Sequence, residues 1–95
     1  MKIIIGESKL FDVLQTFVNS INYDEVCEFI VDPERDENGD IWINAVISEY
    51  WWYYEDNIQS MNKVFQVNKI RREVREQIKS FTGIDVRVGS YVKKC

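Results

Sequence analysis

The feature that most constrains the fold is a long amphipathic pattern between Ile58 and Thr82. Its apolar residues recur at intervals of three and four, which places them on one face of an α-helix. Gly83 follows the pattern, as glycine commonly follows the last turn of a helix. A helix this long must bury its apolar stripe against another element. The residues of the predicted stripe are Ile58, Met61, Val64, Val67, Ile70, Val74, Ile78 and Phe81.

The rest of the chain alternates between strand and helix patterns. A second amphipathic helix is expected from Ser8 to Ile21, with Ser8 as its N-cap. Strands are expected over residues 2–5, 26–32, 40–50 and 84–92, where β-branched residues are frequent or apolar residues alternate with polar ones. Asn38 and Gly39 tolerate positive φ, so they indicate a hairpin turn between the second and third strands.

This order predicts an α+β fold in a single domain that covers residues 1–95. The pattern is β-α-β-β-α-β, which is typical of a ferredoxin-like sandwich with one antiparallel sheet and two helices on one face. If the short first strand is absent, the order becomes αββαβ. Neither architecture determines a function, because such folds host many unrelated activities.

Composition excludes several classes of function. The chain has no histidine and no glycine-rich phosphate loop, so it lacks the commonest general base and metal ligand. Its two cysteines, Cys27 and Cys95, do not form a disulfide framework of the secreted type, which favours a reducing compartment. Cys27 is expected to be a buried thiol. We therefore predict that the protein is not an enzyme, that it uses no cofactor, and that it does not span a membrane.

Charge is distributed unevenly along the chain. Residues 1–60 carry three cations and thirteen acids, whereas residues 61–95 carry nine cations and three acids, for a net charge of −4. This asymmetry favours self-association or a partner that recognises one face. The overall acidity argues against nucleic-acid binding.

The acidic segment from Pro33 to Asp40 could be taken for a cation site. Its acidic and amide side chains alternate as in the first half of an EF-hand loop, with a glycine at the sixth position. The twelfth position is Ala45, so the bidentate carboxylate is missing. We interpret the segment as a solvated hairpin loop, and we expect no metal there. The four residues in question are Glu34, Asp36, Asn38 and Asp40.

Two groups of residues are candidates for partner binding. The first is the aromatic run of Tyr50, Trp51, Trp52, Tyr53 and Tyr54. In an extended segment, adjacent side chains leave on opposite sides, so at most one indole can serve the core and the other is expected at the surface. The second group is a basic row on the exposed face of the long helix, in which Arg71, Arg75 and Lys79 are expected to be unpaired and Arg72 to pair with Glu76. It consists of Arg71, Arg72, Arg75 and Lys79.

The two ends of the chain resemble a family of proteins. The opening MKIIIGESKLFDVLQTFV and the closing IKSFTGIDVRVGSY resemble small uncharacterised accessory proteins of tailed phages. Residues 1–5, Glu7, Ser8, Leu10 and Phe11 carry the resemblance at the N-terminus, whereas Gly6 departs from a frequent threonine. The resemblance implies a phage-encoded accessory protein that is located in the virion or the host cytoplasm.

Together these features predict a non-enzymatic protein-interaction protein that is part of a larger assembly, through a protein partner or self-assembly. One alternative is an inhibitor of a host defence or regulatory protein that uses its acidic face. Another is a single-stranded nucleic-acid binder, for which Trp42 and Tyr91 could stack bases.

Overall fold

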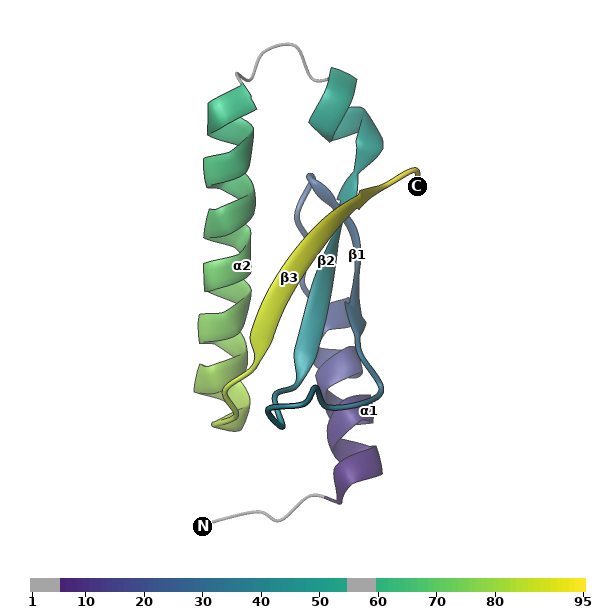
Figure 1. The fold of residues 1–95 in the computed structure, drawn as a ribbon, viewed down its shortest axis with the longest axis vertical. Coiled ribbons are helices and arrows are strands. Elements are labelled where there is room, and N and C mark those ends of the chain that lie inside the picture. The colour runs from purple at the N-terminus through teal and green to yellow at the C-terminus, as the bar shows by residue number, and fades with distance from the viewer. Residues whose placement is uncertain (1–5, 55–59) are drawn as a thin grey trace.

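The structure is a computed structural model that describes residues 6–54 and 60–95 (Figure 1). Two helices, a hairpin, a short π-helical turn and a last strand follow one another along the chain. In order they are α1 (Glu7–Asn19), β1 (Val26–Val31), β2 (Trp42–Ser48), η1 (Tyr50–Tyr54), α2 (Ser60–Thr82) and β3 (Arg87–Lys93). The α+β class is confirmed. The predicted first strand, over residues 2–5, lies outside the described residues, and the described elements follow the αββαβ order with η1 added.

The three strands form a mixed sheet in the order β1-β2-β3. β1 and β2 form the predicted antiparallel hairpin, whereas β2 and β3 are parallel. The prediction of a wholly antiparallel sheet was therefore wrong. A parallel pair needs a long crossover, and α2 carries the chain back along the sheet so that β3 can start beside the beginning of β2 (Figure 1).

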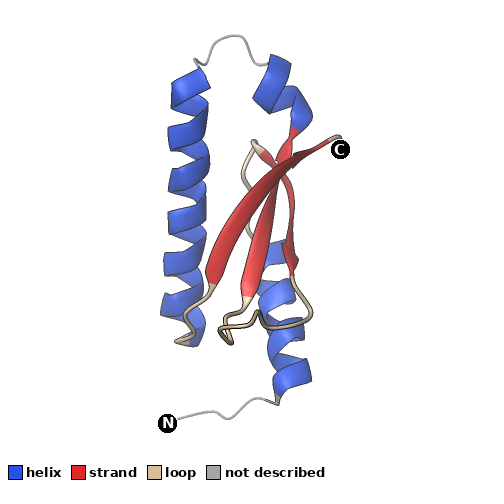
Figure 2. Ribbon diagram, in the orientation of Figure 1, coloured by secondary structure: helices blue, strands red, loops and turns tan. Residues whose placement is uncertain are grey.

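One face of the sheet carries the core, and both helices pack against it. Alternate residues of the strands point to this face, because side chains in a strand change sides at every residue. α1 lies against β1, and α2 runs beside β3 (Figure 2). The buried residues of the core cluster are Leu10, Leu14, Val18, Phe29, Val31, Ile41, Ile43, Ala45, Ile47, Trp51, Val67, Ile70, Val74, Ile78, Val86 and Val88.

Each outer edge of the sheet is partly covered by a helix side chain. The side-chain amide of Gln15 in α1 makes the hydrogen bonds that a neighbouring strand would make with the edge of β1. Its Nε2 donates to the Phe29 carbonyl at 2.8 Å, and its Oε1 accepts from the Val31 N–H at 2.9 Å. On the other edge, Arg71 Nε of α2 donates to the Val88 carbonyl at 2.7 Å. These bonds satisfy edge groups that would otherwise be open to pairing with another chain.

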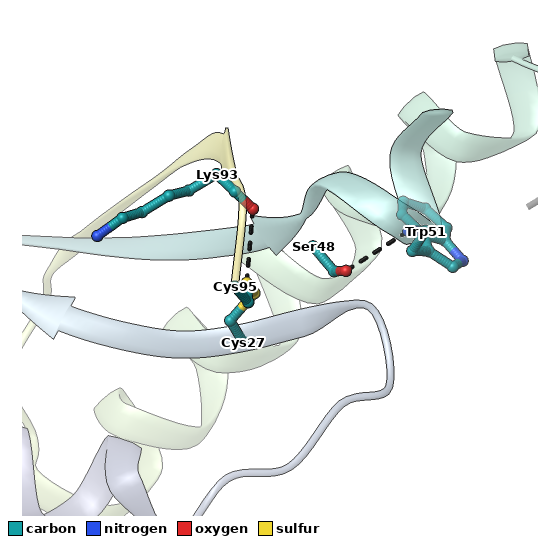
Figure 3. The surroundings of a disulfide bond; sticks show 5 residues. All are labelled: Cys27, Ser48, Trp51, Lys93 and Cys95. Atoms are coloured by element: carbon teal, nitrogen blue, oxygen red, sulfur yellow. Dashed lines mark hydrogen bonds between the residues drawn. A yellow bond between two sulfur atoms is a disulfide. The ribbon is translucent and has the colours of Figure 1, made fainter. Parts of the chain in front are cut away.

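A disulfide joins Cys27 to Cys95, with the two Cα atoms 6.2 Å apart (Figure 3). Cys27 is exposed at a bulge in β1, where the register with β2 shifts between Val26 and Glu28. The residues after β3 turn across β2 to reach β1, so the bond ties the two edge strands together. The expectation of unpaired cysteines, with Cys27 as a buried thiol, was wrong, since residues 68 positions apart meet only in the folded chain.

The helix ends follow the sequence with one exception. α1 begins at Glu7 with Gly6 at the N-cap position, so Ser8, the expected N-cap, lies inside the first turn. α2 ends at Thr82 as predicted, and Gly83 has a φ of 75°, the left-handed conformation that glycine adopts at low cost. Among the described helices, none is long and apolar enough to cross a bilayer.

Candidate functional site

The aromatic run folds into the π-helical turn η1 at one end of the sheet (Figure 2). Trp51 points into the core and is 7% exposed. Trp52 is half-buried, packs against the core, and has its ring centroid 6.2 Å from that of Trp51. Tyr50, Tyr53 and Tyr54 are 62–68% exposed. The exposed aromatic rings of this run are thus phenols.

The prediction that one indole would stand at the surface was wrong. It assumed an extended segment, in which neighbouring side chains point in opposite directions. In the helical turn, the side chains of Trp51 and Trp52 instead point in neighbouring rather than opposite directions, so both contact the core. The tyrosines differ from the tryptophans in that each phenol hydroxyl can stay hydrated while its ring is available for contact.

The first turns of α2 also carry three exposed apolar side chains. Met61 and Phe65 are 70% and 64% exposed, and Val64 is 47% exposed. Lys63 is buried, and its Nζ donates to the Trp52 carbonyl at 2.8 Å, which ties this part of α2 to η1. Lys63 points to η1, and Met61 and Phe65 stand two residues before and after it, so they point to the opposite side of α2. We therefore define the aromatic end by the phenols of η1 alone. It consists of Tyr50, Tyr53 and Tyr54, whose ring centroids lie 6.1 Å (Tyr50–Tyr54) and 6.4 Å (Tyr53–Tyr54) apart.

The sequence placed Met61 and Val64 in the core. Met61 and Val64 belong to the predicted stripe of α2, but the buried stripe starts at Lys63 and continues through Val67 and Ile70. The reason is length: α2, with 23 residues, is about 34 Å long, whereas the seven residues of β2 span roughly 24 Å. The N-terminal turns of α2 therefore extend past the core face of the sheet.

The last residue of the predicted stripe is also exposed. Phe81 is 68% exposed, and it stacks on Phe17 of α1 with ring centroids 4.7 Å apart. This pair joins the two helices at their C-terminal ends. Ile58, the first residue of the stripe, lies outside the described residues.

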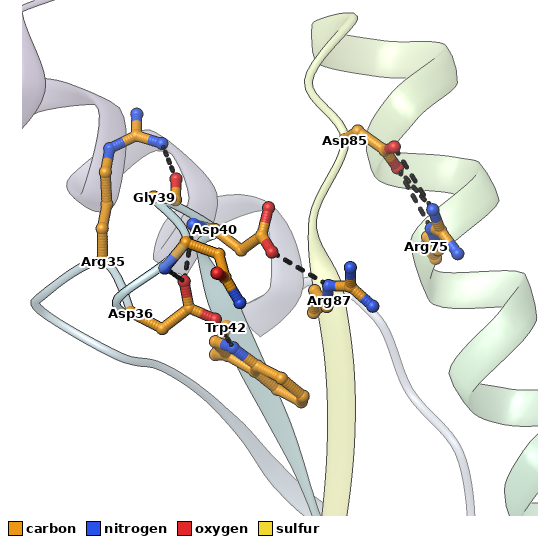
Figure 4. Close-up of polar contacts among 9 residues, drawn as sticks. Arg35, Asp36, Gly39, Asp40, Trp42, Arg75, Asp85 and Arg87 are labelled. Carbon is orange, nitrogen blue, oxygen red and sulfur yellow. Dashed lines mark hydrogen bonds and ion pairs between the residues drawn. The ribbon is translucent and has the colours of Figure 1, made fainter.

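Half of the basic row is engaged within the molecule. Arg71 donates to the Val88 carbonyl, and Arg75 forms a two-pronged ion pair with Asp85, with N–O distances of 3.0 and 3.2 Å (Figure 4). The prediction that both are unpaired was wrong, because β3 and the turn before it fold back against this face of α2. Arg72 and Lys79 are exposed, and neither makes a hydrogen bond or ion pair with the described residues.

The acidic segment is a structured turn organised by Asp36. One carboxylate oxygen accepts from the backbone N–H groups of Asn38 and Asp40, both at 2.9 Å, and the other accepts from Trp42 Nε1 at 2.8 Å (Figure 4). Trp42, Asp40, Asn38 and nearby Arg87 hold the pKa of the Asp36 carboxyl below its ordinary value. In the part of the chain that the structure describes, no group of three acids or cysteines is arranged to hold a metal ion.

These bonds predict a pH-dependent contribution of Asp36 to stability. We expect Asp36→Ala to lower Tm at pH 7 by more than Asp32→Ala, the matched loss of an exposed acid with no side-chain hydrogen bond to the described residues. The folded-state pKa is depressed, so the contribution is present above the ordinary pKa and disappears as the pH falls through the folded one. The gap between the variants should therefore narrow below about pH 4 in thermal denaturation. Equal Tm values at pH 7 would contradict this role.

Comparison of the chain with known protein families, with curated proteins and with solved structures found no match.

Proposed function

We propose that the chain is a non-enzymatic protein-interaction protein that associates with a second copy of itself through the aromatic end. The observation that carries this proposal is the cluster of three tyrosine rings on η1, which are 62–68% exposed and have neighbouring ring centroids 6.1 and 6.4 Å apart. Contiguous apolar surface of this kind typically marks a contact site, and tyrosine is enriched among the residues that dominate binding energy.

The charge of the aromatic end fits a symmetric dimer. At the observed exposures its three side chains offer roughly 400 Å² per copy, about half of the ~800 Å² per partner of a standard interface, and would form the centre of the contact. None of the three is charged. A two-fold axis could therefore place the same surface of two copies together without repulsion at the contact.

The paired cysteines bear on where such an assembly would work. Disulfides persist in oxidising surroundings, and virion surfaces are among them, whereas the cytoplasm keeps thiols reduced. Of the two locations expected for a phage accessory protein, the virion agrees better with the Cys27–Cys95 bond. We therefore include a place in a phage particle in the proposal.

Sedimentation equilibrium of matched double variants tests the dimer. Tyr53→Ser with Tyr54→Ser removes two large side chains from the aromatic end, and Met61→Ser with Phe65→Ser removes exposed apolar side chains from the opposite side of α2. We expect the first pair to raise the dimer Kd at least ~100-fold, since loss of a hot-spot residue costs about 2 kcal/mol or more, and the second to leave it nearly unchanged.

Salt provides an independent readout. An uncharged contact should hold at both low and high ionic strength, whereas a contact between the acidic and basic parts of the chain should weaken as salt is added. A wild-type chain that stays monomeric at high concentration, or equal weakening by both double variants, would overturn the assignment of the aromatic end.

A further inference from the structure

A basic pocket of about 330 Å³ lies between α2 and β3. It is close to the hairpin turn that joins β1 and β2, at the opposite end of the sheet from the aromatic end. Four arginines line it together with Trp42 and Asn68: Arg71, Arg72 and Arg75 come from α2, and Arg87 begins β3. Its volume is within the range of small-ligand sites in proteins. No carboxylate side chain is among the described residues that line it.

Three of the guanidinium groups are held in place by partners at the margin of the pocket, and Figure 4 shows two of them, Arg75 and Arg87. Arg71 is held through Nε by the Val88 carbonyl, and its Nη1 lies 3.3 Å from Asn68 Oδ1. Arg75 uses Nε and Nη2 on Asp85, whereas Arg87 uses Nε on Asp40 at 3.1 Å.

These contacts leave donors available for a ligand. Arg71 retains Nη2, Arg75 retains Nη1, and Arg87 retains both terminal nitrogens. All the guanidinium nitrogens of Arg72 are available to a ligand, because Arg72 bonds to none of the described residues. Three acids at the margin, Asp36, Asp40 and Asp85, offset four cations, so the pocket stays positive although the chain as a whole is acidic. Planar guanidinium forks match the oxygens of a phosphate in pairs, and fixed side chains lose little entropy on binding.

Trp42 supplies an aromatic wall. Its indole N–H is held by Asp36, and its ring lies over β3 at Gly89. A Cβ atom at position 89 would meet Trp42 ring carbons at 3.4 and 3.6 Å and Asn44 Oδ1 at 2.7 Å. Glycine therefore lets the indole lie close to the strand. A tryptophan face is a suitable platform for a nucleobase, because every base has an aromatic face that can stack on the indole ring.

We propose that this pocket binds the phosphate of a nucleotide, with the base stacked on Trp42. The arginines recognise the phosphate and the indole recognises the ring, so both parts of the ligand are needed for full affinity. The phosphate-bearing nucleotide can be free or can stand at the end of a single strand, because either presents the same group to the pocket. This site is separate from the aromatic end, so its test is independent of the dimer.

Calorimetric titration with AMP, adenosine and inorganic phosphate tests the assignment on the intact chain. We expect AMP to bind at least tenfold more tightly than phosphate, and adenosine to show no measurable binding. A 5′-phosphorylated single-stranded oligonucleotide forms the second arm. Tighter binding of AMP or of the oligonucleotide supports the site in either case and identifies which source of phosphate it prefers.

Arg72→Gln is the decisive variant, because Arg72 has no partner among the described residues and its loss should leave the fold intact. We expect it to weaken AMP binding at least tenfold. Lys79→Gln removes the same charge from the same helix outside the pocket and should leave AMP binding unchanged. The proposal is overturned if AMP does not bind at millimolar concentration, if it binds no better than phosphate, or if the two variants weaken it equally.

Discussion

Replacing Cys27 and Cys95 together with serine should lower the free energy of unfolding by about 4 kcal/mol. The bond closes a loop of 68 residues, so its loss releases most of the chain in the unfolded state. The folded state should change little, since both cysteines are exposed and the core does not contain them. A domain of this size is stable by only about 5–15 kcal/mol, so the loss is a large part of the total.

Urea denaturation of the oxidised protein and of the double variant measures this effect. Wild-type protein unfolded in the presence of a reductant serves as the control, and it should match the variant. We also expect a steeper dependence on urea without the bond, because the unfolded chain then exposes more surface. Identical midpoints for oxidised and reduced protein would show that the Cys27–Cys95 bond contributes nothing to stability.

Ile78→Ala is expected to destabilise the fold by roughly 2–5 kcal/mol. Ile78 is fully buried on the face of α2 that packs on the sheet, so its truncation removes apolar contacts and leaves a cavity. Lys79→Ala is the matched control, because Lys79 follows directly in the helix and is exposed. Alanine favours helix at least as well as either residue, so helix propensity does not explain a difference.

The free energies of unfolding of both variants can be compared by urea titration followed by circular dichroism. Lys79→Ala should remain within about 0.5 kcal/mol of the wild type, as is usual for exposed positions. A small and equal effect of the two substitutions would mean that the buried face of α2 has been assigned to the wrong residues.

Elements with a strong local pattern could be predicted from the sequence. The central stripe of α2 from Val67 to Ile78, the hairpin around Gly39, and the helical stop at Gly83 all match the structure. In each case the conformation is decided by neighbours in the chain: a period of 3.6 or 2, or a residue that tolerates positive φ.

The candidate sites were predicted less well, because exposure depends on where other elements end. The sequence singled out Tyr50, Tyr53 and Tyr54, but it could not separate them from the two tryptophans. Arg87 lies far from Arg72 in the sequence, and the two line one pocket only because β3 returns beside α2.

The sequence by itself determined the class of the fold, the hairpin, and the two amphipathic helices. Only the tertiary structure decided the parallel pairing of β3, the π-helical turn that buries Trp51, and the meeting of Cys27 with Cys95. The physical reason is range. Periodicity and turn chemistry act over a few residues, whereas pairing, burial and disulfide geometry depend on the path that brings distant segments together.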